Sequence, residues 1–411
     1  MYNTIKIIIA TLLFGLMGLI IGCDKDESPT GTNATPDQTD GRITIVNDED
    51  KLNDRVTIFS DTIQVKDSTL AKRTSPNAVK LVLEAEIAPP SINGQKLQAT
   101  SVSLDGDFAY ISYNIQGNTY AGAIDIVQVK GGKKATIRSQ ALFNDTKVSA
   151  VYYDKTTTNV YLAEANGNAA LASPAVVEKV GTSGNKLSLS STTKTVLSSY
   201  VTTSVLAKNN KVYATTGNTG GLYTLTKDSL KELSNYPISD ARWVDVDANY
   251  IAVVQGGGKL SVFNATTGTF INTYNFTGTS IPESKSTVQI IGGKALIAAG
   301  DGGMVLMNLA TGKVVGSIPR TIVTGLDPSV TVTNAAAASG EYVYLSNGEA
   351  GVYQAKSGQD LTSSTGDTNI SLTIQGKLMF QSLQSVNHVA FDGETLVIAS
   401  GLGGVKIVKV N

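Results

Sequence analysis

Seven short apolar segments recur along residues 109 to 399, and each has the length of a single β-strand. Their first residues are 51, 52, 39, 45, 47 and 53 positions apart, which is close to a regular period. A sustained period of this size indicates a repeat architecture in which each unit packs on its neighbours. The segments occupy residues 109–112, 160–163, 212–215, 251–254, 296–299, 343–346 and 396–399.

Each apolar segment lies within a predicted series of β-hairpins. A preceding apolar stretch and a polar turn lead into it, as with Gly-Gly-Lys at 292–294 and Asp-Gly-Glu at 392–394. Glycine reaches positive φ without a Cβ clash, so these turns are typical of hairpins. Most segments are followed by a glycine-led third strand and a further turn, such as Ala-Thr-Gly at 310–312. Four antiparallel strands in a repeat of about 40 to 50 residues predict a β-propeller.

The two ends of the repeat region predict how the ring closes. The last repeat has three strands and stops at Asn411, whereas the strand-like segment Leu81–Ile87 precedes the first repeat and belongs to none. We therefore expect Leu81–Ile87 to supply the outer strand of the last blade, which leaves no splayed sheet edge. The predicted fold is an all-β, seven-bladed β-propeller over residues 81–411. The rival architecture, a pair of β-sandwich domains, does not account for the three-strand ending.

The N-terminus has the pattern of an exported protein. An apolar run over residues 7–21 is shorter than the roughly 20 residues of a membrane-spanning helix and fits a signal-peptide core. It ends in Gly22-Cys23, which resembles the lipobox of bacterial lipoproteins, in which the cysteine receives a diacylglycerol and becomes the new N-terminus. We interpret residues 1–22 as a lipoprotein signal peptide and Cys23 as the lipidation site. The alternative is an uncleaved anchor helix with an incidental cysteine.

The residues after Cys23 bear on where the protein resides. Asp-Lys-Asp-Glu at 24–27 resembles the acidic export signal of surface lipoproteins in Bacteroidota, although an Asp after the cysteine also resembles an enterobacterial inner-membrane retention signal. The first resemblance implies an outer-membrane lipoprotein, lipid-anchored at the cell surface. Residues 23–41 are nearly free of apolar side chains and are predicted to be a flexible tether. Residues 42–80 are predicted to be an N-terminal extension with short strands, either packed on the propeller or loose.

The glycine-led third strands carry a second resemblance. Gly-Gly-Val-Lys-Ile-Val at 403–408 resembles the LVIVD-repeat propellers of bacterial surface proteins, and the likeness covers roughly residues 81–411. The sequence lacks the WD dipeptide and the kelch glycine and tryptophan pattern. The resemblance implies a fold and a location rather than an activity.

Composition excludes several kinds of chemistry. The 33 Lys and Arg residues balance 34 Asp and Glu residues, so no basic excess favours nucleic acid. A single cysteine and a single histidine, His388, leave no intramolecular disulfide and too few ligands for a Cys/His zinc site. We therefore expect no cofactor and no metal. Asp-Val-Asp-Ala-Asn at 245–249 matches only the opening of a calcium loop and is interpreted as a turn.

Candidate ligand-binding residues lie in or beside the loops that enter the first strand or leave the second strand of a repeat. Three of them, Glu164, Asp301 and Glu349, would form an acidic ring for a cation or an amine if they converge, whereas solvated loop carboxylates are the alternative. His388 either faces the channel or, in the favoured interpretation, is a hydrogen-bonded core histidine. The sole tryptophan, Trp243, is expected to pack between blades. The full candidate set is Glu164, Asp240, Arg242, Asp301, Glu349, Asn387 and His388.

Because no nucleophile motif, metal cluster or phosphate loop occurs, the sequence favours a non-enzymatic binding or scaffold module. Its partner would be an extracellular protein, peptide or glycan, with membrane contact through the N-terminal lipid and no nucleic acid. The alternative is a carboxylate-based hydrolase or lyase acting on extracellular polysaccharide, which needs two carboxylates at a defined separation. A structural role in a larger outer-membrane complex is a third possibility, which an apolar stripe on the rim would favour.

Overall fold

The described part of the chain consists almost entirely of β-strands. A computed structural model describes residues 37–66, 79–131, 134–363, 366–382 and 384–411, all of which belong to the compact unit of residues 35–411. Within these ranges the helices are α1 (Glu49–Asn53) and the short 3-10 helix η1 (Pro328–Val330). Neither is long and apolar enough to cross a membrane. The predicted signal peptide and Cys23 lie outside the described residues.

Four sheets follow one another along the chain, and each has four antiparallel strands in chain order. Their strands are β11 (Thr146–Asp154), β12 (Asn159–Asn166), β13 (Ala175–Ser183) and β14 (Lys186–Val196); β15 (Ser204–Lys208), β16 (Lys211–Thr215), β17 (Gly221–Thr226) and β18 (Glu232–Pro237); β19 (Ala241–Val246), β20 (Tyr250–Gln255), β21 (Lys259–Asn264) and β22 (Phe270–Asn275); and β23 (Val288–Ile291), β24 (Lys294–Ala298), β25 (Met304–Asn308) and β26 (Val314–Ile318).

The remaining strands form two larger sheets and one small hairpin. The first large sheet has the order β1 (Gln38–Thr39), β2 (Ile43–Val46), β10 (Thr136–Phe143), β9 (Gly122–Gln128), β8 (Phe108–Asn114) and β7 (Gln98–Asp105). The second has the order β27 (Ala335–Ser339), β28 (Tyr342–Ser346), β29 (Val352–Ser357), β30 (Leu372–Met379), β3 (Val56–Lys66), β4 (Leu81–Ile87), β33 (Val405–Val410), β32 (Thr395–Ala399) and β31 (His388–Phe391). The hairpin pairs β5 (Ser91–Ile92) with β6 (Gln95–Lys96).

The predicted apolar segments form the second strand of each run, and burial explains why they stand out in the sequence. In β24, for example, every residue is buried, because a neighbouring sheet covers each face. A strand that is covered on both faces appears as a continuous apolar run rather than as an alternating one. Outer strands differ: all six residues of β18 are exposed.

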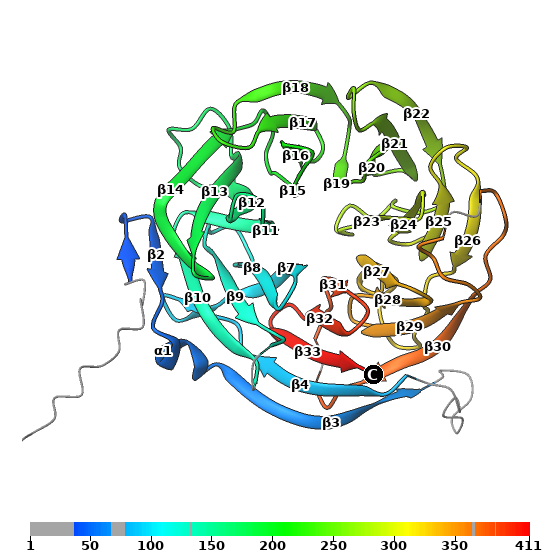
Figure 1. Ribbon diagram of the computed structural model, residues 1–411, viewed down its shortest axis with the longest axis horizontal. Helices are drawn as coiled ribbons and strands as arrows, with labels where there is room; N and C mark the ends of the chain where they lie inside the picture. Colours follow the sequence, from blue (N-terminus) through cyan, green and yellow to red (C-terminus); the bar gives the residue numbers. More distant parts are fainter. Residues whose placement is uncertain (1–36, 67–78, 132–133, 364–365, 383) are drawn as a thin grey trace, which may run out of the picture. The chain divides into compact units, whose positions relative to one another are not determined.

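The sheets are arranged around a central axis, with the first strand of each run innermost (Figure 1). Apolar clusters lie between adjacent sheets. One of them joins Ala85 and Ile87 of β4 and Val405 of β33 to Ala99 and Ile111 of the first sheet, so the last strands pack on the first. The predicted role of Leu81–Ile87 is confirmed at the level of pairing, since β4 lies antiparallel to β33 with Ile87 opposite Val405.

The N-terminal extension packs on the outside of this arrangement. Strand β2 continues the first sheet beyond β10, and β3 pairs with both β4 and β30 (Figure 1). Gln38–Thr39, at the end of the segment predicted to be a tether, forms the short strand β1 against β2. The earlier part of that segment, up to residue 36, lies outside the described residues.

Candidate functional site

The inner strands enclose a small cavity on the central axis. This central cavity, of about 280 Å³, is lined by side chains from the first strand of every run, including Tyr152, Trp243, Gln289, His388 and Phe391. Trp243 therefore faces the axis, although its ring also packs against clusters on either side of its own sheet, as the sequence led us to expect. The rings of Trp243 and His388 lie 5.3 Å apart between centroids.

A second cavity opens where the loops enter the first strands. This polar cavity, of about 460 Å³, is lined mainly by amides, hydroxyls and charged groups, with Val201 and Pro282 as its apolar side chains. Asp240, Arg242 and Asn387, three of the sequence-predicted residues, meet here. The other polar lining residues are Gln98, Thr100, Asn114, Ser149, Thr203, Asn218, Glu283, Ser284, Lys285 and Asn334.

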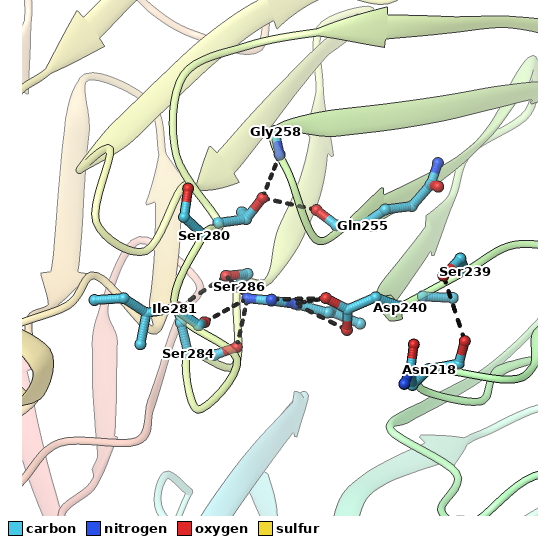
Figure 2. Close-up of polar contacts among 12 residues, drawn as sticks. Asn218, Ser239, Asp240, Gln255, Gly258, Ser280, Ile281, Ser284 and Ser286 are labelled. Atoms are coloured by element: carbon cyan, nitrogen blue, oxygen red, sulfur yellow. Dashed lines mark hydrogen bonds and ion pairs between the residues drawn. The ribbon is translucent and has the colours of Figure 1, made fainter.

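Arg242 holds one wall of the polar cavity in place. Its guanidinium is only 5% exposed; Nη2 donates to Asp240 Oδ2 at 2.8 Å and Nη1 donates to the carbonyl oxygen of Ile281 at 2.9 Å. A further bond from Nη1 reaches the carbonyl oxygen of Ser284 at 3.2 Å. Arg242 thereby links the start of β19 to the loop before β23, and Figure 2 shows its partners Asp240, Ile281 and Ser284 facing one another. The Asp240 and Arg242 charges neutralise each other, so their role in the wall is positioning.

Lys285 lies between the two cavities and was missed by the sequence analysis. Its Nζ donates to the carbonyl oxygen of Ser149 at 2.8 Å and sits 5.1 Å from the centroid of the Trp243 ring. Burial lowers the pKa of Lys285 to about 7. The position of Lys285 could have indicated it. The Pro-Glu-Ser-Lys stretch at 282–285 precedes the first strand of its repeat, and Asp240 and Arg242 lie at the start of the first strand of theirs.

His388 is buried and faces the axis. Its Nδ1 has no hydrogen-bond partner among the described residues, which differs from the favoured expectation of a hydrogen-bonded core histidine. Burial and, secondarily, the charge of Lys285 lower the pKa of His388 to about 3. The imidazole is therefore neutral at physiological pH, and its ring serves as a packing surface for Trp243.

The three carboxylates of the expected acidic ring have different surroundings. Glu349 lines a cavity of about 430 Å³ beside the polar one, with Asn387 shared between the two. Asp301 accepts a hydrogen bond from the backbone N–H of Ser280 at 2.8 Å. Glu164 is wholly buried and none of the cavities described here includes it. The ring that would hold a cation therefore lacks one of its three expected members.

Glu164 belongs instead to a buried charge cluster between the first two sheets. It lies near Glu178, whose carboxylate accepts two hydrogen bonds from the guanidinium of Arg42. Neither oxygen of Glu164 has a hydrogen-bond partner in the described part of the chain. Burial and the charge of Glu178 raise the pKa of Glu164 well above its usual value.

In the calcium-like stretch at 245–249, Asp245 and Val246 end β19, and residues 247–249 form the predicted turn to β20. Asp247 caps it by accepting bonds from the backbone N–H groups of Asn249 and Tyr250, both at 2.7 Å. Asp245 accepts a bond from the N–H of Ile290 at 2.6 Å, and burial raises its pKa to about 6. Within the ranges that the structure describes, no group of acidic, cysteine or histidine side chains is arranged to hold a metal ion.

An apolar patch covers the outer strands of two adjacent sheets. We call Tyr236 of β18 and Phe270 of β22 the rim patch, since each is at least 40% exposed. The rings of Tyr236 and Phe270 stack with centroids 5.4 Å apart. This is the kind of stripe that the sequence analysis associated with a role in a larger assembly.

Comparison with solved structures identifies the fold. The WD40 repeats of RRP9 match with a TM-score of 0.58 and 12% identity, over 85% of this chain and 100% of that one. U3-55K gives 0.56 and 11%, over 77% and 97%, and the WD40 β-propeller domain of Doa1 gives 0.51 and 11%, over 78% and 96%. No protein-family model and no curated protein sequence matches the chain. The likeness concerns the fold alone, which is β-propeller-like, and the resemblance to LVIVD-repeat proteins stays an expectation.

Proposed function

We propose that this protein is a lipid-anchored binding module of the bacterial cell envelope, built as a seven-bladed β-propeller. The count of seven takes each run of β7–β10, β11–β14, β15–β18, β19–β22, β23–β26, β27–β30 and β31–β33 with β4 as one blade. The observation that carries the binding function is the polar cavity, where side chains from several sheets converge on a hollow of about 460 Å³. Sites of this size that are lined by a few fixed polar groups are typical of small-ligand binding.

The arrangement of carboxylates favours binding over catalysis. Hydrolysis of a glycosidic bond commonly uses two carboxyl groups on either side of the scissile bond. In the polar cavity the Asp240 carboxylate is paired with Arg242, and Glu283 lies exposed on the loop before β23. Glu164 is buried elsewhere. A hydrolase or lyase acting on extracellular polysaccharide remains the alternative, and product formation is the observation that would favour it.

The binding function is tested by blocking the cavity. Purified protein is screened against an array of glycans and short peptides, with Asn218→Leu as the blocking variant, since Asn218 lines the cavity. Asn272→Leu, on the exposed outer strand β22, is the matched control. We expect Asn218→Leu alone to lose the ligand. Equal binding by both variants would overturn the cavity assignment, and release of shortened glycans would favour the enzyme.

The proposed location rests on Cys23 and the acidic run after it. Metabolic labelling with a fatty acid is expected to label the wild-type protein and to leave Cys23→Ser unlabelled. Protease treatment of intact cells then separates a surface-facing protein, which is digested, from a periplasmic one, which is protected. Labelling of the Cys23→Ser variant would contradict the lipoprotein assignment.

The rim patch supports a second candidate function, which is contact with a protein partner in a larger envelope complex. Exposed aromatic side chains are frequent at protein interfaces. Tyr236→Ser combined with Phe270→Ser is expected to abolish cross-linking to that partner in cells while leaving the polar cavity intact. Unchanged cross-links would eliminate this candidate.

A further inference from the structure

The floor of the polar cavity carries a positive charge that the protein does not neutralise. Buried Lys227 and Lys406 each pair with a carboxylate, Asp154 and Glu86 respectively. Lys285 differs, because its contacts within the described residues are a carbonyl oxygen of Ser149 and the Trp243 ring. An ammonium can donate three hydrogen bonds, so Lys285 retains donor capacity.

Lys285 is half-buried, and withdrawing such a charge from water without a counterion is costly. The other ionic groups of the lining do not compensate Lys285. Arg242 and Asp240 neutralise each other, and Glu283 is exposed to solvent, where screening leaves its charge only a weak effect on Lys285. A bound anion would supply the missing counterion.

The walls define the rest of the ligand. Amides and hydroxyls dominate them, and the side-chain amide of Asn218 is engaged by no described residue. Such groups can both donate and accept, which suits ligand hydroxyls.

We propose that the polar cavity binds a hydroxyl-rich carboxylate, a uronic acid unit of an acidic glycan, with its carboxylate on Lys285 Nζ and its hydroxyls on the surrounding amides. This inference deepens the proposed binding function and rests on it. Asn218 would contact the hydroxyl groups, and Arg242 would position the wall without contacting the carboxylate.

The test is calorimetric titration with a tri-galacturonate, a glucuronate-containing trisaccharide and the methyl ester of the tri-galacturonate. The methyl ester keeps the hydroxyl groups of the ligand and removes its charge. Comparing acid and ester therefore tests the role of the ligand charge on the wild-type protein, without any variant. We expect an acidic trisaccharide to bind and its ester to bind at least tenfold more weakly. Binding of neither acidic trisaccharide, or equal binding of acid and ester, would overturn the inference.

Three variants localise the contact. Lys285→Met is expected to weaken binding of the acid at least tenfold, with Lys285→Gln as the replacement if the Met variant does not fold. Lys259→Met, at an exposed position of β21, removes the same charge and is expected to have no effect. Glu283→Gln is expected to strengthen binding about twofold or more, because it removes an anion from the cavity lining. An unchanged affinity in Lys285→Met would overturn the assignment.

A pH profile gives an independent readout. Protonation of Lys285 near pH 7 should strengthen binding of the acid as the pH falls from 8 to 6. The charged side chains that line the cavity with Lys285 are Asp240, Arg242 and Glu283, and its buried neighbour His388 stays neutral in this range. A neutral glycan that binds without this pH dependence would leave the general binding function standing while overturning the uronate inference.

Discussion

At the scale of single residues, burial decides which charges the fold tolerates. Glu164 and Glu178 both point between the first two sheets, yet only Glu178 has a cation, Arg42, bonded to it. Desolvation penalises the charged form of a carboxylate, so the unpaired Glu164 holds its proton more tightly than it would in water. Glu178 thus stabilises the folded chain through its ion pair with Arg42. Glu164 is expected to be tolerated because its carboxyl group can stay neutral.

This difference predicts opposite effects for two similar substitutions. Because the pKa of Glu164 is raised in the folded state, the folded chain keeps a proton that the unfolded chain releases above about pH 4.5. Its contribution to stability is therefore present at low pH and falls as the pH rises. Glu164→Gln should remove that fall and raise the free energy of unfolding at pH 8 above that of the wild type.

The matched variant is Glu178→Gln, which leaves Arg42 without its partner. Breaking a buried ion pair by removing one member costs about 3 kcal/mol or more. Urea denaturation of both variants and the wild type at pH 4.5 and pH 8 measures the two effects. If the Glu164→Gln variant and the wild type lose stability equally between these pH values, Glu164 is ionised in the folded protein and this account is wrong.

Glu164 also marks a limit of sequence reasoning. It follows the apolar segment 160–163 directly, and was therefore expected to lie in a loop at the channel mouth. Strand β12 continues to Asn166, however, and side chains alternate along it, so Glu164 shares the face of Val160 and Leu162 between the sheets. Its neighbours Arg42 and Glu178 come from distant parts of the chain. In contrast, Asp240, Arg242 and Asn387 lie in or next to first strands, so the repeat pattern alone indicates that they lie close together at one cavity. Their role in ligand binding stays a prediction.

At the scale of elements, glycines after the second strands join neighbouring runs of strands. Gly300, Gly348 and Gly401 each form an isolated bridge to a residue at or just before the first strand of the next run of strands around the ring. All three have positive φ, a conformation that costs other residues energy. The glycine-led turns that reveal the repeat in the sequence thus form the hairpins and also hold adjacent strands together at the mouth of the channel.

Gly348→Ala should therefore destabilise the fold. Gly348 has φ of 53°, and an added Cβ would lie 2.2 Å from the carbonyl oxygen of Val330. We expect a loss of about 2 to 3 kcal/mol from combined backbone strain and overlap. Gly340→Ala is the matched control, because its φ is 59° and nothing lies within 4 Å of the added Cβ. Chemical denaturation compares the two, and equal losses would mean that the close approach to Val330 has no energetic weight.

Other elements were only partly predictable. Val56–Lys66 forms the long strand β3, whereas the sequence indicated only short strands in the extension of residues 42–80. Its burial pattern shows no clear alternation, because β3 lies on the outside and pairs with β4 along residues 56–63 and with β30 along residues 64–66. Strand β30 is distant from β3 in the sequence, and β4 has no distinctive composition. No local sequence pattern therefore predicts these pairings.

At the scale of the whole compact unit, the N-terminal extension supplies charges that the sheets need. The guanidinium of Arg55 bonds to both oxygens of Asp125, and that of Arg42 bonds to both oxygens of Glu178. Asp125 and Glu178 are themselves fully buried. The extension, which follows the predicted tether, is therefore an integral part of the folded unit.

A chain that begins at residue 79 tests this dependence. It lacks β1, β2, α1 and β3, so Asp125 and Glu178 lose their cations, and the edges of β30 and β4 become free. Each broken buried pair is worth about 3 to 5 kcal/mol, so the shortened chain should unfold at a much lower urea concentration than the chain that begins at residue 37. Exposed strand edges should also make it aggregate.

Restoring neutrality separates the two causes. In the shortened chain, Asp125→Asn together with Glu178→Gln removes the unpaired charges but leaves the edges free, so we expect partial recovery of the urea midpoint and continued aggregation. In the chain beginning at residue 37, the same pair of substitutions should instead destabilise, because it removes acceptors from Arg42 and Arg55. A double substitution with the same sign of effect in both chains would show that these ion pairs do not attach the extension. The attachment would then have to come from strand pairing along β3 alone.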